Sequence, residues 1–167
     1  MLLADTVKLL VTTFAPTAKF KSICIVLNLA TIFDWELHGI DIENAFLESD
    51  LEETIYMKLP VDTYSEPNGK PGIVSLKKSL YGIKQAGELF YKLMKRKLTS
   101  EDTGMKCCMY DMCVFILFDD ETNERIITLL WVDDIIITGN TLSIVERIIS
   151  CIESNVKKIS KMGEITT

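Results

Sequence analysis

Residues 126–138 have the sequence IITLLWVDDIIIT, in which two strongly apolar runs are separated by two adjacent aspartates. Short apolar runs rich in β-branched residues are typical of buried strands. The interruption predicts that the two runs form a tight antiparallel hairpin with Asp133 and Asp134 at its tip. Bare acids are unusual at such a position, and they mark the turn as a candidate functional site.

A further candidate acid ends an alternating segment earlier in the chain. Residues Trp35–Ile42 place Leu37, Gly39 and Asp41 on one face, which predicts a strand that ends at an acid. If this strand lies beside the hairpin, Asp41 and Asp133 converge at one edge of a sheet. Like charges that close destabilise a fold unless something binds there, and no cation is near them in the sequence.

The remaining pattern predicts one mixed domain. Three segments have apolar residues at helical spacing, namely Phe20–Phe33 with Ser22 as its N-cap, Gln85–Ser100, and Thr141 to about Lys158. Shorter segments predict an apolar strand at 113–118 and two short strands at 55–59 and 74–76. They also predict a helical turn at 44–53 and a loop insertion at 60–72. We therefore predict an α+β fold of residues 1–167, an antiparallel sheet with helices packed on one face.

Length and composition exclude several classes of protein. With 167 residues, 48% hydrophobic residues and a net charge of −6, the chain can form one ordinary core and is not expected to be disordered. No apolar run approaches the roughly 18–20 residues of a membrane span, and the N-terminus lacks the layout of a secretory signal. Five cysteines without a C-x-x-C spacing and one histidine argue against a zinc site and a disulfide framework. We expect an intracellular protein without a membrane partner, in cytoplasm or nucleus.

Charge is distributed unevenly along the chain. Ten acids and one base between Asp34 and Glu66 give a net charge of −9, whereas seven bases and one acid between Lys77 and Lys97 give +6. Two solvated faces whose charges interleave would explain this pattern. The alternative is a basic surface for phosphates beside an acidic site for a divalent metal.

The carboxylates of Asp41, Asp133 and Asp134 carry the most specific chemical hypothesis. Hard oxygen ligands suit Mg²⁺ or Mn²⁺, and two such ions about 3.5–4 Å apart activate the attacking oxygen in phosphoryl transfer. The simpler interpretation is an Asp-rich turn in water, because Asp is a favoured turn residue. The residues alone leave both interpretations open.

Five motifs stand in a fixed order along the chain. They are TFAPTAKF (13–20), DWELH (34–38) leading into DIENAFL (41–47), DLEE (50–53) with IYM (55–57), LKKSLYGIKQA (76–86) and VDDIIITGN (132–140). Together they resemble the reverse transcriptase domain of Ty1/copia-type retrotransposons, over nearly the whole chain. The resemblance implies an incomplete RNA-directed DNA polymerase from a Pol polyprotein, with a palm-type core, partial fingers and no thumb.

The resemblance also implies roles for the acids and for one aromatic residue. Asp41 and Asp133 match the two main catalytic aspartates and Asp134 a more peripheral one, together holding two Mg²⁺ or Mn²⁺ ions for nucleotidyl transfer onto a primer 3′-OH. Phe46 matches the aromatic steric gate, whose ring occupies the space of a ribose 2′-OH and favours deoxynucleotides. Core packing is the simpler role for this ring.

The implied partners are an RNA or DNA template with its primer and deoxynucleoside triphosphates. The nucleotide would lie under the segment that holds Tyr81, Gly82, Lys84 and Gln85, in which Gly82 permits close backbone approach. Nucleic acid would contact a basic block and the residue before the Val-Asp-Asp motif, namely Lys77, Lys78, Lys92, Lys95, Arg96, Lys97 and Trp131.

Departures from the family pattern predict low activity for the chain alone. Trp131 stands where the family has Tyr, and Gly87-Glu88 stands where it has Pro-Arg. We expect the chain to lack the basic fingers strands of the family and to stop before the last palm strand. Two alternatives are an inactive remnant that acts as a nucleic-acid-binding or interaction module, and a decayed reading frame whose uncovered sheet edge causes aggregation. The oligomeric state stays open.

Overall fold

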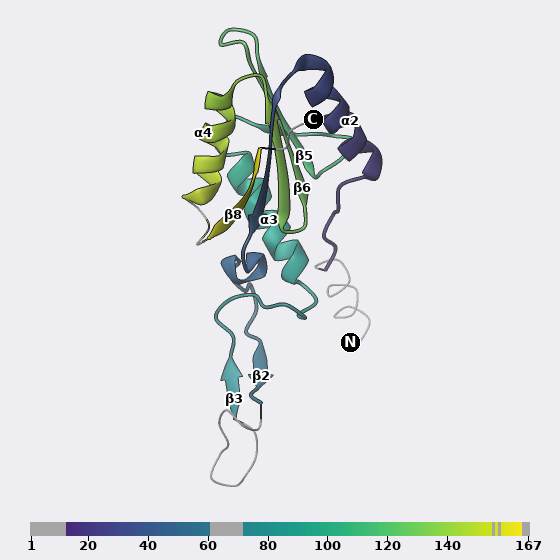
Figure 1. The fold of residues 1–167 in the computed structure, drawn as a ribbon. Helices are drawn as coiled ribbons and strands as arrows, with labels where there is room; N and C mark the ends of the chain where they lie inside the picture. Colours follow the sequence, from purple (N-terminus) through teal and green to yellow (C-terminus); the bar gives the residue numbers. More distant parts are fainter. Residues whose placement is uncertain (1–12, 61–71, 155, 157, 165–167) are drawn as a thin grey trace.

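The computed structural model describes residues 13–60, 72–154, 156 and 158–164. A six-stranded antiparallel sheet with the strand order β4-β5-β6-β7-β1-β8 forms its centre, and a two-stranded hairpin projects from one end (Figure 1). The elements in chain order are α2 (Phe20–Phe33), β1 (Glu36–Ile42), the 3-10 helix η1 (Ala45–Glu48), β2 (Tyr56–Lys58), β3 (Ile73–Ser75), α3 (Ala86–Leu98), β4 (Lys106–Cys107), β5 (Val114–Asp119), β6 (Glu124–Trp131), β7 (Asp134–Gly139), α4 (Leu142–Glu153) and β8 (Ile159–Glu164). The predicted α+β class and antiparallel sheet are confirmed.

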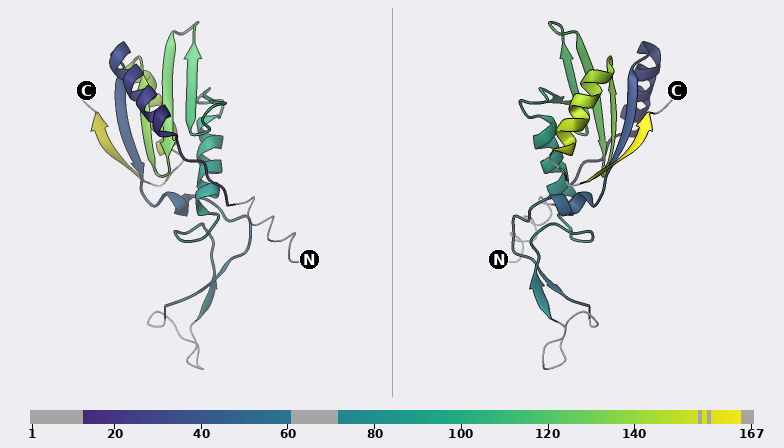
Figure 2. Two further views of the ribbon diagram at one scale, coloured as in Figure 1. Left: turned by 90° about the vertical axis from the view of Figure 1, so that its right-hand side faces the viewer. Right: turned by 60° about the vertical axis from the view of Figure 1, so that its left-hand side comes forward.

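Helices cover both faces of the sheet, so the prediction of one covered face is wrong. α2 lies against β6 and β7 on one side, and α3 and α4 lie on the other side (Figure 2). The reason is visible in β6, where Ile126, Ile127 and Leu129 are all buried although neighbouring side chains point to opposite faces. A strand that is apolar on both faces requires cover on both faces.

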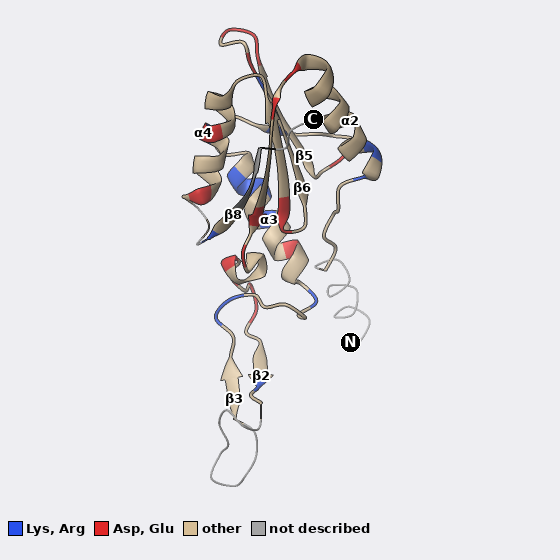
Figure 3. Cartoon of the chain, in the orientation of Figure 1, with Lys and Arg blue, Asp and Glu red and all other residues tan. Residues whose placement is uncertain are grey.

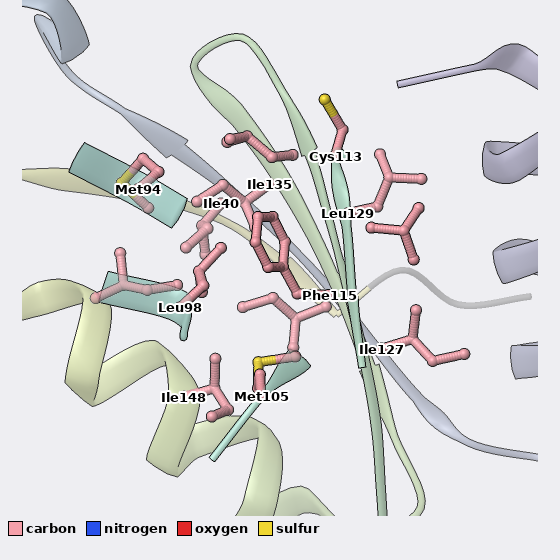
Figure 4. Close-up of a cluster of buried hydrophobic side chains, with 14 of the residues drawn as sticks. Ile40, Met94, Leu98, Met105, Cys113, Phe115, Ile127, Leu129, Ile135 and Ile148 are labelled. Atoms are coloured by element: carbon pink, nitrogen blue, oxygen red, sulfur yellow. The ribbon is translucent and has the colours of Figure 1, made fainter. Parts of the chain in front are cut away.

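The larger core lies between the sheet and the α3–α4 layer. Phe115 and Ile135 of the sheet point toward Met94 and Leu98 of α3 and toward Ile148 of α4 (Figure 4). All five are almost fully buried, and each contributes about 1.5–3 kcal/mol through removal of apolar surface from water. On the opposite face, Ile127 and Leu129 point toward α2 (Figure 4). The sheet is therefore fixed from both sides.

The N-terminus of α2 is held by an acid far away in the sequence. Asp111 Oδ2 accepts hydrogen bonds from the backbone N–H of Lys19 (2.8 Å) and from Ser22 Oγ (2.6 Å), and its Oδ1 accepts one from Cys113 N–H (3.0 Å). Burial raises the pKa of Asp111, but the hydrogen bonds from Ser22, Lys19 and Cys113 outweigh burial and hold it below its usual value. The prediction that Ser22 is the N-cap is wrong, because its hydroxyl donates to Asp111.

β8 is a strand that the sequence analysis did not predict. It pairs antiparallel with β1, so that Asp41 lies opposite Ser160 and Ile42 opposite Ile159. β1 is therefore an inner strand, paired on both sides, and β8 forms the edge of the sheet.

The projecting hairpin, called the arm below, consists of β2 and β3. Tyr56 lies opposite Ser75, and the N–H of Leu59 donates to the carbonyl of Gly72 at 2.8 Å. Both predicted short strands are confirmed, whereas residues 61–71 of the predicted 60–72 insertion lie outside the described residues. In the described part of the chain, no helix has the length and apolarity needed to cross a membrane.

Candidate functional site

The predicted hairpin is confirmed, with Asp133 in its turn and Asp134 as the first residue of β7 and not in the turn. β6 ends at Trp131 and β7 begins at Asp134, and these two residues lie directly opposite each other. Val132 and Asp133 therefore form a two-residue turn. Val132 has a φ of 56°, in the left-handed region, and this conformation costs a β-branched residue about 1–3 kcal/mol. The surrounding structure thus imposes the shape of the turn against the preference of its residue.

Strand β1 brings the third acid to the same place. Asp41 is the cross-strand partner of Asp134, and the N–H of Ile42 donates to the carbonyl of Asp133 at 3.0 Å. Directly opposed residues of an antiparallel pair project their side chains on the same face of the sheet. The structure therefore places Asp41, Asp133 and Asp134 together at one end of the sheet.

The negative charges of the three carboxylates repel one another. The pKa of Asp134 is raised, first by burial and then by the negative charges of Asp133 and Asp41. Within the described ranges, none of the three carboxylates forms an ion pair with a Lys or Arg. Such a cluster attracts a cation.

The donor chemistry of the three acids suits a hard divalent metal, because Mg²⁺ and Mn²⁺ prefer carboxylate oxygens. Across residues 13–60, 72–154, 156 and 158–164, no group of three or more His, Cys, Asp or Glu side chains is already arranged to hold a metal ion. Asp41, Asp133 and Asp134 thus match such an ion in the chemistry of their donors and in backbone placement, but their side chains are not arranged to hold one.

Two aromatic rings of the candidate nucleotide-contacting set pack on each other. Phe46, on η1 shortly after Asp41, has its ring centroid 4.4 Å from that of Tyr81 and 6.0 Å from that of Phe90. The pKa of Tyr81 is raised by burial and then by the negative charges of Asp133 and Asp41. The structure therefore packs two of the candidate nucleotide-contacting residues, Phe46 and Tyr81, against each other.

The rest of the candidate nucleotide-binding segment leads into α3. Gly82 has a φ of 95°, a conformation that favours glycine, and no atom lies within 4 Å of the place where a Cβ would stand. The Lys84 side chain is exposed, and Gln85 is the N-cap residue of α3, whose carbonyl accepts from the N–H of Leu89 at 3.0 Å. Gly82 thus leaves an open approach to the backbone next to Tyr81.

Part of the basic block is neutralised by the acidic block. Lys92 pairs with Glu88 at 3.0 Å and with Glu52 at 3.6 Å, and Lys78 pairs with Asp50 at 2.7 Å. Acidic residues gather where the lower ends of the central strands meet η1 and the arm (Figure 3). The interleaving of charges that the sequence suggested is therefore present, and it involves Lys78 and Lys92 of the candidate nucleic-acid contacts. The exposed members of that set are Lys77, Lys92, Lys95, Arg96 and Trp131, of which Lys92 is ion-paired.

Residues 5–167 match the family described as "Reverse transcriptase (RNA-dependent DNA polymerase)". The chain belongs to this family. The "Retrovirus-related Pol polyprotein from transposon TNT 1-94" of Nicotiana tabacum is 37% identical over 135 residues, which cover 81% of the chain and 10% of that protein. The corresponding polyprotein from transposon RE1 of Arabidopsis thaliana is 34% identical over 128 residues, 77% of the chain and 8% of that protein. The "Truncated transposon Ty1-A Gag-Pol polyprotein" of Saccharomyces cerevisiae is 32% identical over 139 residues, 83% of the chain and 11% of that protein.

These relatives identify the chain as a reverse transcriptase domain of the Ty1/copia type. The chain spans about a tenth of the length of the curated relatives it matches. No solved structure matches the chain.

No local sequence pattern indicates that the segment before Tyr81 contacts the segment after Phe46. Asp50 and Lys78 form an isolated antiparallel bridge as well as an ion pair, and Ser79 N–H donates to the carbonyl of Ser49 at 2.9 Å. Asp50 and Lys78 both lie in the family motifs, but neither motif indicates a partner. Only the opposite signs of the two charge blocks pointed toward a contact of this kind.

Proposed function

We propose that the chain is the part of an RNA-directed DNA polymerase in which a nucleotide is transferred onto a primer 3′-OH, with the sheet as the polymerase palm. The observation that carries the proposal is the pairing of Asp41 with Asp134 beside the Asp133 turn. The strained Val132 and the absence of a Lys or Arg partner, within the described residues, mean that this arrangement lowers stability. Clusters of titratable groups that perturb one another are typical of functional sites.

The three carboxylates would hold Mg²⁺ or Mn²⁺. Two such ions, when bound, supply activation of the attacking oxygen and stabilisation of the leaving oxygen. The residues around them bind and orient the substrate. Phe46 excludes a ribose 2′-OH by occupying its space, and Tyr81 forms the neighbouring wall. Gly82 lets the nucleotide approach the backbone, and Lys84 and Gln85 lie on the same segment.

Nucleic acid would be held through its phosphates, without reading of the bases. Lys77, Lys95 and Arg96 are exposed and have the charge for such contacts. Lys78 and Lys92 are partly neutralised by acids of this chain and contribute less. Exposed Trp131 lies opposite Asp134 and presents a ring next to the acids. Template binding would therefore weaken steeply as salt is raised.

Primer extension tests the proposal. The wild-type chain, Asp133→Asn and Asp120→Asn are compared on a primed RNA template with deoxynucleotides and Mg²⁺ or Mn²⁺. Asp120 is the matched control. It is an exposed aspartate that pairs with Arg125, and it lies in the turn between β5 and β6, at the end of β6 that is far from Asp133. We expect Asp133→Asn to lose extension by at least about 100-fold and Asp120→Asn to retain it. Extension by Asp133→Asn at the wild-type rate would refute the proposal, and wild-type binding of primed template without extension would favour the remnant that only binds.

A further inference from the structure

The Phe46 ring lies between two other rings of very different burial. Phe90 is 2% exposed and meets Phe46 edge to face, at 6.0 Å and an interplanar angle of 75°. Tyr81 is 50% exposed and lies closer, at 4.4 Å with an angle of 51°. Phe90 is held in place by the core and cannot move away from Phe46. Of the two rings in contact with Phe46, Tyr81 is therefore the one that is less constrained by the core.

The backbone that carries Tyr81 is attached to the backbone that carries Phe46. Lys78 Nζ binds Asp50 Oδ1 at 2.7 Å and the carbonyl of Glu48 at 3.1 Å, and the N–H of Ser79 donates to Ser49 O at 2.9 Å. The segment just before Tyr81 is thus bound to the segment just after Phe46. This attachment holds the two backbone segments that carry the rings next to each other.

The contact is made by the ring of Tyr81 and not by its hydroxyl. Within the described residues, the Tyr81 hydroxyl takes part in no hydrogen bond, whereas the ring packs on Phe46. A phenylalanine at this position would keep the packing, and an alanine would remove it. The two substitutions therefore separate the function of the ring from the function of the hydroxyl.

We propose that Tyr81 is a positioning residue that holds the Phe46 ring at the sugar of the incoming nucleotide and thereby sets discrimination between deoxyribonucleotides and ribonucleotides. The inference rests on the proposed function, in which Phe46 borders the nucleotide sugar. Without Tyr81, the Phe46 side chain can turn into the vacated space and leave room for a 2′-OH. The discriminating unit is then a pair of rings, of which only Phe46 faces the sugar.

The test measures the affinities of the chain for 2′-deoxyadenosine triphosphate and adenosine triphosphate in Mg²⁺. The variants are Tyr81→Ala, Tyr81→Phe and the control Tyr110→Ala, which removes a tyrosine that is 79% exposed. Fluorine NMR of the chain labelled with 4-fluorophenylalanine, with the Phe46 signal assigned by Phe46→Leu, reports the ring contact directly. We expect Tyr81→Ala to move the Phe46 signal and to reduce the deoxyribonucleotide preference by about tenfold, and Tyr81→Phe and Tyr110→Ala to retain the preference.

A double variant distinguishes positioning from direct contact. In a Phe46→Ala background, Tyr81→Ala should cause no further loss of preference, because the ring that it positions is gone. A further loss there would mean that Tyr81 contacts the sugar itself and would overturn the inference. Unchanged preference in Tyr81→Ala would also overturn it while leaving the proposed function intact. Failure of the wild-type chain to bind either nucleotide would instead refute the proposed function, and the inference with it.

Discussion

Replacing Asp134 with Asn should stabilise the metal-free chain, because it removes one of three like charges with almost no change in size. Asp134 lies directly opposite Asp41, and opposed Cα atoms of an antiparallel pair are about 4.5–5.5 Å apart. Two unit charges about 4 Å apart repel by about 1 kcal/mol in water and by about 4 kcal/mol at the effective dielectric constant near a protein surface. Since Asp134 is only partly buried, the lower end of this range applies. We expect the free energy of unfolding at pH 7 to rise by about 1–2 kcal/mol.

The pH dependence of this difference has a definite sign. The pKa of Asp134 in the folded chain is raised by burial and by its two acidic neighbours. A carboxyl whose folded-state pKa lies above its unfolded value, about 3.9, destabilises the fold above the folded pKa and has no such effect below the unfolded one. The stability difference between Asp134→Asn and wild type should therefore be largest at neutral pH. It should shrink as the pH falls through the raised pKa.

Urea unfolding followed by circular dichroism measures the difference, in low salt with a chelator, between pH 7 and about pH 4.5. Asp120→Asn is the control, because Asp120 pairs with Arg125 and removing that charge should not stabilise the chain. Added Mg²⁺ should stabilise the wild type more than the variant and so narrow the difference. An Asn variant that is less stable than wild type at pH 7, or a stability difference that does not change with pH, would refute the electrostatic reasoning.

Three further substitutions test other contacts. Asp111→Ala removes the acceptor of three hydrogen bonds at the start of α2 and should lower the free energy of unfolding, measured in urea, by about 3 kcal/mol. A loss under about 0.5 kcal/mol would contradict a stabilising role of these hydrogen bonds. Val132→Gly should raise the thermal midpoint, because it relieves about 1 kcal/mol of strain at a φ of 56°; a lower midpoint would count against that strain. Gly139→Ala should lower the free energy of unfolding in urea by about 1–3 kcal/mol, because a Cβ would lie 3.0 Å from Ile144 Cγ2 and 3.1 Å from Arg125 O. An unchanged urea midpoint would mean that helix α4 moves aside.

The local parts of the fold could be predicted from the sequence. The helix Phe20–Phe33 has the predicted bounds, and the hairpin around Asp133 follows from two apolar runs that flank a polar dipeptide. In each case the signal is contained in a short window, because side-chain periodicity and turn chemistry are local properties. The placement of Asp41 beside the hairpin required an assumption about strand order, and the pairing with β7 supports it.

The parts that could not be predicted depend on contacts between distant segments. β8 contains Lys161, Gly163 and Glu164 and lacks the pattern of a strand, and its pairing with β1 arises from the sheet that is already in place. The hydrogen bonds of Asp111 to Lys19 and Ser22 join residues about ninety positions apart, so no local signal could reveal them. The same is true of the contact between Phe46 and Tyr81. The acids of the site were thus predictable, whereas the surroundings that hold and confine them were not.

The inner position of β1 determines when the acidic cluster can come apart. β1 is hydrogen-bonded to β7 and β8, and β7 is hydrogen-bonded to β1 and β6, so both strands that bear the acids are protected on each side. Amide protons in such strands exchange with solvent only when the whole domain opens, while the ends of the sheet and the arm exchange through local opening. Asp41 and Asp134 should therefore stay in register through every partial opening of the molecule, and the site should be lost in a single cooperative step together with the fold.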